Sequence, residues 1–294
     1  MTAVRRLGFG LCALVVMAPA LLLFHPAQGA RTVAGSRLVT LRVGGVERDY
    51  RLFVPAASTH ARPLLLALHQ LHGSAQAWER RSGLDAGAAT AGVVVAYPDG
   101  IDHSWNAGTC CQPAAGSGVD DVAFLRAVVA DVARRTPIDL SRVAVTGFSN
   151  GALMAYRLVC TAASTVHVAI AVAGDLVAGR CEPSRPVSML HVHGGRDTVI
   201  PVNGMARSPL DPAGFPPART SIDLVATADR CAASDDSGDS VISVRRASGC
   251  AGDARVELVT SARLGHTYPV GRASSAYGVD MATLTWQFLA SVWR

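Results

Sequence analysis

One serine lies in a pattern that is typical of covalent acyl transfer. Gly147-Phe148-Ser149-Asn150-Gly151 matches Gly-x-Ser-x-Gly and directly follows an apolar run around 143–145. A sharp turn of this kind between a strand and a helix exposes the serine oxygen, and the glycines leave room for the two flanking elements. The pattern predicts Ser149 as the nucleophile. A serine that only caps the helix is the alternative.

A serine hydroxyl is a weak nucleophile, so it needs a base, and the base needs an acid to orient it. After such a turn the partners follow in the order Ser, Asp or Glu, His. His266 is the only histidine after His193, so it is the expected base. The alternative is that His266 is a histidine of a surface loop with no catalytic role. Asp197, just past the apolar run that ends near Val192, is the expected acid, and Asp175 is its rival.

Acyl transfer also needs N–H groups that stabilise the developing oxyanion. The residue after the nucleophile, here Asn150, supplies one of them, and a loop after an early strand supplies the other. That loop spans 69–74, where the N–H of Leu71 is the first candidate and that of Gln70 the second. Both donors are expected to be backbone groups.

Four histidines could be read as metal ligands, namely His69, His72, His191 and His193. They flank the ends of predicted strands, where a histidine can instead brace the loop that carries the oxyanion donor. No cysteine pair has the spacing of a zinc finger or ribbon. We therefore expect neither a metal nor a cofactor.

The elements that must position these groups alternate along the chain. Continuous apolar runs, typical of parallel strands buried on both faces, occur at 64–68, 93–96, 143–145, 168–172 and 187–192. Helical spacing of apolar residues marks 121–134, and further helices are expected at 150–158 and 283–294. Alternating strands and helices predict an α/β domain with a parallel sheet. Two strand-like runs around Gly44-Gly45 predict a hairpin ahead of it.

The N-terminus has the order of an export signal. A pair of arginines precedes an apolar run over 7–24, and a small-x-small site follows at 27–29. We expect residues 1–29 to be removed and a single catalytic domain, 30–294, to be secreted with no stable membrane span. An uncleaved membrane anchor is the alternative.

The composition of the chain indicates which partners to expect and whether its cysteines are oxidised. The net charge is +5, but the arginines are scattered, so no nucleic-acid partner is expected. An even set of cysteines in an exported chain predicts disulfides, although their pairing stays open at this point. The candidates are Cys110, Cys111, Cys160, Cys181, Cys231 and Cys250. Residues 232–249 are polar and are expected to form a loop.

Together these segments resemble a secreted esterase family that contains poly(3-hydroxybutyrate) depolymerases, feruloyl esterases and acetylxylan esterases, within the α/β-hydrolase superfamily. The likeness covers most of the chain after residue 29. Besides the Ser149 pentapeptide it rests on the early strand at 64–68 with its loop at 69–74, Tyr97-Pro98-Asp99-Gly100, residues 105–111, Val119-Asp120-Asp121-Val122, Met154-Ala155-Tyr156-Arg157-Leu158, residues 183–187, residues 191–197 and Gly265-His266-Thr267.

The resemblance implies the α/β-hydrolase fold, with a mostly parallel central sheet and helices on both faces. It implies Ser149, Asp197 and His266 as the triad, and the N–H groups of Leu71 and Asn150 as the oxyanion hole. The family usually has Gly and often Cys at the positions of Gln70 and Leu71, so this chain departs from it there.

The resemblance also implies disulfides that link the Cys110-Cys111 loop to Cys160 or Cys181, with Cys231 joined to Cys250. It implies hydrolysis of carboxylic esters through an acyl-enzyme. A polyester oligomer, a feruloyl or acetyl group on a polysaccharide, and a small ester are the candidate substrates. A lipase or peptidase on the same triad, or a non-catalytic envelope protein that keeps the fold, are the alternatives.

Overall fold

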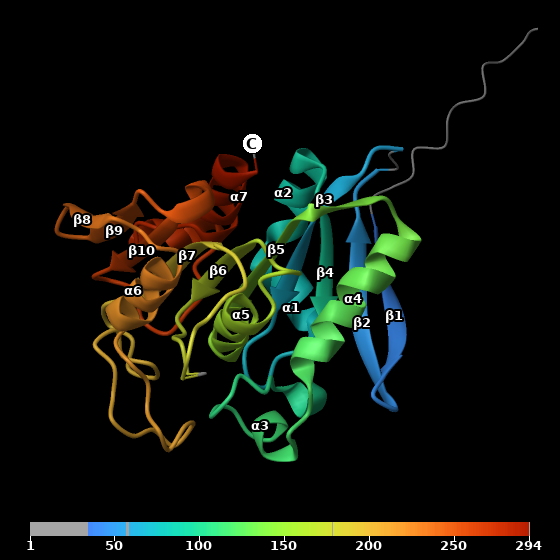
Figure 1. Cartoon of the computed structure of the whole chain (residues 1–294), viewed down its shortest axis with the longest axis horizontal. Helices are drawn as coiled ribbons and strands as arrows, with labels where there is room; N and C mark the ends of the chain where they lie inside the picture. The colour runs from blue at the N-terminus through green and yellow to red at the C-terminus, as the bar shows by residue number, and fades with distance from the viewer. Residues whose placement is uncertain (1–34, 57–58, 178, 294) are drawn as a thin grey trace, which may run out of the picture. The chain divides into compact units, whose positions relative to one another are not determined.

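The computed structural model describes residues 35–56, 59–177 and 179–293, which belong to one compact unit (Figure 1). The expected export signal, 1–29, lies outside the described residues. Among the helices that are described, none has the length and apolarity needed to cross a membrane.

The described part of the chain forms one ten-stranded sheet in the order β1-β2-β4-β3-β5-β6-β7-β10-β9-β8. The strands are β1 (Gly35–Val43), β2 (Val46–Val54), β3 (Arg62–Leu68), β4 (Val94–Pro98), β5 (Ile138–Phe148), β6 (Val168–Val172), β7 (Ser188–Gly194), β8 (Ala233–Gly238), β9 (Ile242–Ser248) and β10 (Val256–Ser261). The six strands from β4 to β10 along this order run parallel. The predicted parallel α/β sheet is therefore confirmed.

Helices cover both faces of the sheet, as Figure 1 illustrates. They are α1 (Ala75–Ser82), α2 (Leu84–Ala91), α3 (Ala114–Ser117), α4 (Asp121–Arg135), α5 (Asn150–Thr161), α6 (Ala218–Ala228) and α7 (Met281–Val292). Strand β3 illustrates why both faces are apolar. Leu64 and Leu66 belong to the apolar core on the face that carries α4, α5 and α6, whereas Leu65 between them belongs to the core on the face of α1, α2 and α7, because successive strand residues point to opposite faces.

The predicted hairpin at the start of the domain is also confirmed. β1 and β2 pair antiparallel from Gly35↔Val54 to Val43↔Val46. The turn needs its two glycines, because Gly44 and Gly45 have φ values of 58° and 84°.

The expectation of a polar loop at 232–249 is wrong. β8 and β9 form an antiparallel hairpin there, and β9 joins the sheet through β10. Every residue of β8 is exposed, and its Asp, Ser and Gly residues are uncommon in strands. An exposed edge strand buries no alternating apolar face, so its sequence has no strand pattern.

The described cysteines form three disulfides, Cys110–Cys111, Cys160–Cys181 and Cys231–Cys250. The third is the pair that the resemblance implies. The implied link from the Cys110-Cys111 loop to Cys160 or Cys181 is wrong. Leu153, near the start of α5, packs with Cys110 and Cys111. Cys160 lies about 10 Å further along the axis of the same helix, too far for a disulfide to that loop.

Candidate active site

The turn that carries Ser149 is the joint between β5 and α5. Ser149 has φ 54° and ψ −120°, a conformation that L-residues rarely adopt, and its N–H donates to the carbonyl of Val172 at 2.9 Å. A Cβ at Gly147 would meet the backbone of Gly151, and one at Gly151 would lie 2.7 Å from the carbonyl oxygen of His69. The two glycines are therefore required by close approach of backbone.

The structure brings the three predicted triad residues together. The Nε2 of His266 lies 2.9 Å from the Oγ of Ser149, and its Nδ1 lies 2.7 Å from the Oδ2 of Asp197. His266 comes from the loop after β10, and Asp197 lies three residues beyond β7. When Nδ1–H donates to the carboxylate, Nε2 is free to accept the serine proton.

The environment of Asp197 favours the ionised carboxylate. Its Oδ1 accepts the N–H groups of Val199 and Ile200, both at 2.9 Å. Burial by itself would raise the pKa of Asp197, but the hydrogen bond from His266 and these backbone donors lower the pKa below its ordinary value. The carboxylate can then stabilise the imidazolium that forms when His266 takes a proton.

The rival acid, Asp175, is placed elsewhere. It is fully buried, and within the described residues neither carboxylate oxygen has a hydrogen-bond partner. The nearby ring nitrogens belong to His191 and His193, at 3.8 and 3.9 Å from its Oδ1. The geometry therefore favours Asp197 as the partner of His266.

His69 braces the loop expected to carry an oxyanion donor. Its Nδ1 lies 2.7 Å from the carbonyl of Gln70, and its Nε2 accepts the N–H of Gly100 at 2.9 Å. The indole N–H of Trp105 donates to the carbonyl of His69 at 2.9 Å. Burial lowers the pKa of His69, so the ring is neutral and has one donor and one acceptor, as these two partners require.

Both candidate oxyanion donors are available in the structure. Among the described residues, neither the N–H of Leu71 nor that of Asn150 has an acceptor. Gly73 allows the tight turn in this loop, because a Cβ there would lie 2.8 Å from the carbonyl oxygen of Gln70. An oxyanion hole requires two such free N–H groups, so both remain candidates for that role.

Sequence reasoning missed what the side chain of Asn150 does. Its Oδ1 accepts the N–H of Trp105 at 2.7 Å, and its Nδ2 donates to the carbonyl of Trp105 at 3.0 Å. This pair of buried bonds ties the first turn of α5 to the loop after β4. Only the amide type at position 150 hints at such a clamp, because the partner lies 45 residues away along the chain.

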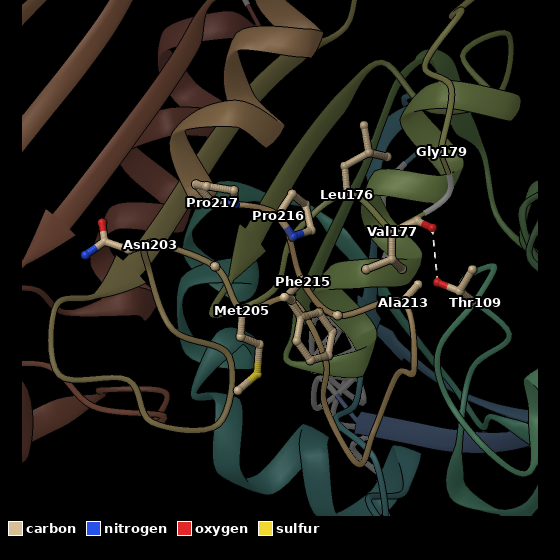
Figure 2. A pocket seen from close by; sticks show the side chains of 13 residues that line it. Thr109, Leu176, Val177, Gly179, Asn203, Met205, Ala213, Phe215, Pro216 and Pro217 are labelled. Atoms are coloured by element: carbon tan, nitrogen blue, oxygen red, sulfur yellow. Dashed lines mark hydrogen bonds between the residues drawn. The ribbon is translucent and has the colours of Figure 1, made fainter.

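A pocket of about 670 Å³ opens beside this site, between the loops that follow β4, β6 and β7 (Figure 2). Its lining is largely apolar and includes Val177, Met205, Phe215, Pro216 and Pro217. No triad residue lines it. Val177 and Phe215 belong to an apolar cluster against which Leu71 packs, so the pocket adjoins the oxyanion loop.

Comparisons with known proteins agree with this architecture. Residues 122–209 match the family described as Phospholipase/Carboxylesterase. NocK of Nocardia uniformis, provisionally named an esterase, is 35% identical over 64% of this chain and 55% of its own. Feruloyl esterase C of Emericella nidulans is 30% identical over 64% of this chain and 72% of its own. An acetyl xylan esterase from Aspergillus awamori has the same fold, with a TM-score of 0.58 at 15% identity, over 82% of this chain and 99% of its own.

The matched stretch spans only about half the length of NocK, but it spans most of feruloyl esterase C. The identity with feruloyl esterase C confirms the resemblance to the feruloyl esterases, and the fold shared with the acetyl xylan esterase confirms the predicted fold class. The chain belongs to the carboxylesterase family of α/β-hydrolase fold that includes the feruloyl esterases.

Proposed function

We propose that this protein hydrolyses carboxylic esters through an acyl-enzyme on Ser149. One observation carries the proposal: the ring of His266 lies between the Ser149 oxygen, at 2.9 Å, and the Asp197 carboxylate, at 2.7 Å. That is the order of nucleophile, base and acid that acyl transfer uses. The esterase names of the relatives support the same reaction class.

The reaction follows from these positions. His266 takes the hydroxyl proton as the Ser149 oxygen attacks the ester carbonyl, and the N–H groups of Leu71 and Asn150 stabilise the resulting oxyanion. The carbon–oxygen bond to the alcohol then breaks, and His266 gives its proton to the leaving alcohol. A water, deprotonated by His266, then attacks the acyl-enzyme; the bond between the acyl carbon and the Ser149 oxygen breaks, His266 returns the proton to that oxygen, and the acid leaves. None of these steps calls for a cofactor.

The proposed substrate is an acylated polysaccharide bearing an aromatic acyl group. The relatives named feruloyl esterase support this class, and so does the apolar pocket that includes Met205 and Phe215. We also propose that residues 1–29 direct export and that 30–294 is the catalytic domain. Three disulfides suit an oxidising compartment.

The test combines labelling with a substrate panel. A fluorophosphonate should label Ser149 alone, and Ser149→Ala should abolish labelling and lower ester hydrolysis by several orders of magnitude. More than about a tenth of the wild-type rate in this folded variant would refute the nucleophile. Methyl ferulate should be cleaved faster than acetylated xylan, hydroxybutyrate oligomers, a triglyceride or a peptide amide. If another of these substrates is cleaved faster than methyl ferulate, the proposed substrate class is wrong.

A further inference from the structure

A second group of polar side chains lies buried behind the triad acid. Asp175 follows β6, and His191 and His193 are two residues apart on β7, so they share one face of the strand. All three are fully buried. The sequence offered His69, His72, His191 and His193 together, but the structure places His69 in the brace of the oxyanion loop and brings only His191 and His193 to Asp175.

The three inward-facing atoms form a triangle of the size of a metal site. The Nε2 of His191 and the Nδ1 of His193 are 2.9 Å apart, and they lie 3.8 and 3.9 Å from the Oδ1 of Asp175. The centre of this triangle is about 2.1 Å from each corner. Zinc bonds to imidazole nitrogen and carboxylate oxygen are about 2.0 to 2.2 Å long.

The outward-facing ring nitrogens are already held. The Nδ1 of His191 lies 2.8 Å from the hydroxyl of Tyr156, and the Nε2 of His193 lies 2.8 Å from the carbonyl oxygen of Ile200. Metal-binding histidines commonly donate the second N–H to an oxygen in this way, which fixes the ring and leaves the first nitrogen free to bind.

The described protein groups leave Asp175 without a hydrogen-bond partner. Both of its oxygens are buried, and no hydrogen-bond partner exists for them in the described part of the chain. The histidines can form a chain by themselves, in which Tyr156 donates to His191, His191 to His193, and His193 to Ile200. That chain satisfies both rings and still leaves the carboxyl group unpaired, which is costly in a protein interior.

We propose that Asp175, His191 and His193 bind a divalent transition-metal ion, and that the ion is zinc. Two imidazoles and a carboxylate suit this metal. Because the ligands are fully buried, the ion is structural. It stabilises the loop that carries the triad acid, since the carbonyl of Ile200 accepts from His193 while its N–H binds Asp197.

The experiment measures metal content in the full-length protein, produced in zinc-supplemented medium and purified without chelators. Inductively coupled plasma mass spectrometry should find about one zinc ion per chain. X-ray absorption should find nitrogen and oxygen neighbours at about 2.0 to 2.2 Å and no sulfur. The isosteric variant Asp175→Asn should lower the zinc content at least tenfold. Asp229→Asn, at another fully buried aspartate, should leave it unchanged.

Two outcomes would overturn the site. One is a folded wild-type protein with less than a tenth of an equivalent of metal, in which case Asp175 is a neutral, unpaired acid. The other is a zinc content that Asp175→Asn does not change, or sulfur neighbours, which would show binding elsewhere. Ser149→Ala should keep its zinc, so the metal site and the proposed hydrolysis can fail separately.

Discussion

The hydrogen bond from His266 to Asp197 decides which nitrogen of the imidazole faces Ser149. Asn at position 197 would present an amide N–H to Nδ1 and favour the tautomer whose proton is on Nε2. That tautomer cannot accept the serine proton. We expect Asp197→Asn to fold normally and to lower kcat by about ten-thousandfold, measured on a p-nitrophenyl ester.

Asp175→Asn is the matched comparison, because Asp175 makes no hydrogen bond to His266 in the structure. Its effect on kcat should stay below about a hundredfold, even if it weakens the support of the acid's loop. If Asp175→Asn proves the more damaging substitution, Asp175 is the acid and Asp197 only an N–H acceptor.

At the residue scale, Ser149 and Asp197 could be predicted because each follows a strand that its apolar run reveals, and His266 because it is the only histidine after His193. The clamp between Asn150 and Trp105 could not be predicted, and neither could the meeting of Asp175 with His191 and His193. These contacts depend on which strands are neighbours, and no local pattern in a single sequence contains that information.

At the scale of elements, the backbone of the oxyanion loop lies so close to the turn between β5 and α5 that position 151 has no room for a side chain. A methyl group at Gly151 would lie 2.7 Å from the carbonyl oxygen of His69, which is backbone and cannot move aside. Gly151→Ala should therefore shift the oxyanion loop, lower kcat/KM by about a hundredfold or more, and destabilise the fold by about 1–3 kcal/mol.

Gly265→Ala serves as the control, because it adjoins His266 yet its added Cβ would lie 3.7 Å from the carbonyl oxygen of Arg196, an ordinary contact. It should keep wild-type stability and at least a third of the activity. Equal losses in the two variants would mean that the site tolerates no change near the triad, rather than that α5 lacks space.

We expect the disulfide to contribute strongly to the stability of the β8–β9 hairpin. Its exposed strand β8 buries almost nothing, and Cys231–Cys250 closes the segment that contains both strands. The Cys231→Ala, Cys250→Ala double variant should lose about 3 kcal/mol on the chain-entropy estimate. We expect the melting temperature to fall while activity at 25 °C is largely kept, since the triad does not touch this hairpin.

The Cys160→Ala, Cys181→Ala double variant is the comparison. The disulfide that it removes closes a segment of similar length, with a separation of 21 residues against 19 for Cys231–Cys250. Comparable losses of stability would support the entropic account. If activity is lost in the Cys231→Ala, Cys250→Ala variant but not in the Cys160→Ala, Cys181→Ala variant, the hairpin supports the loop of His266.

The strands from β3 to β7 were predicted because they are buried on both faces and therefore read as apolar runs, and β1 and β2 were predicted from the strand-like runs around Gly44-Gly45. The strands that were missed lie at the other end of the sheet. β8 has no apolar pattern because it is exposed, and β9 alternates only half-buried residues. For the same reason, the parallel strands from β3 to β7 were predictable, and the antiparallel edge formed by β8 and β9 was not.

At the scale of the whole molecule, stability also depends on buried contacts between helices and strands that take no part in the proposed mechanism. Asp229 makes one of them: it follows α6, is fully buried, and accepts, at 3.2 Å, the N–H of Val187, the residue just before β7. Burial is the main cause that raises its pKa to about 6, against a weaker opposing effect of that hydrogen bond.

An acid whose folded pKa is raised binds its proton more tightly in the folded state. Its stabilising effect is complete below the unfolded pKa, about 3.9, and is lost as the pH rises through 6. Asp229→Asn cannot ionise, so it lacks this loss. Urea denaturation at pH 4.5 and 7.5 should show the variant gaining about 2 kcal/mol relative to wild type between the two values. A difference that stays constant with pH would mean that Asp229 is ionised, and well solvated or paired, in the folded protein.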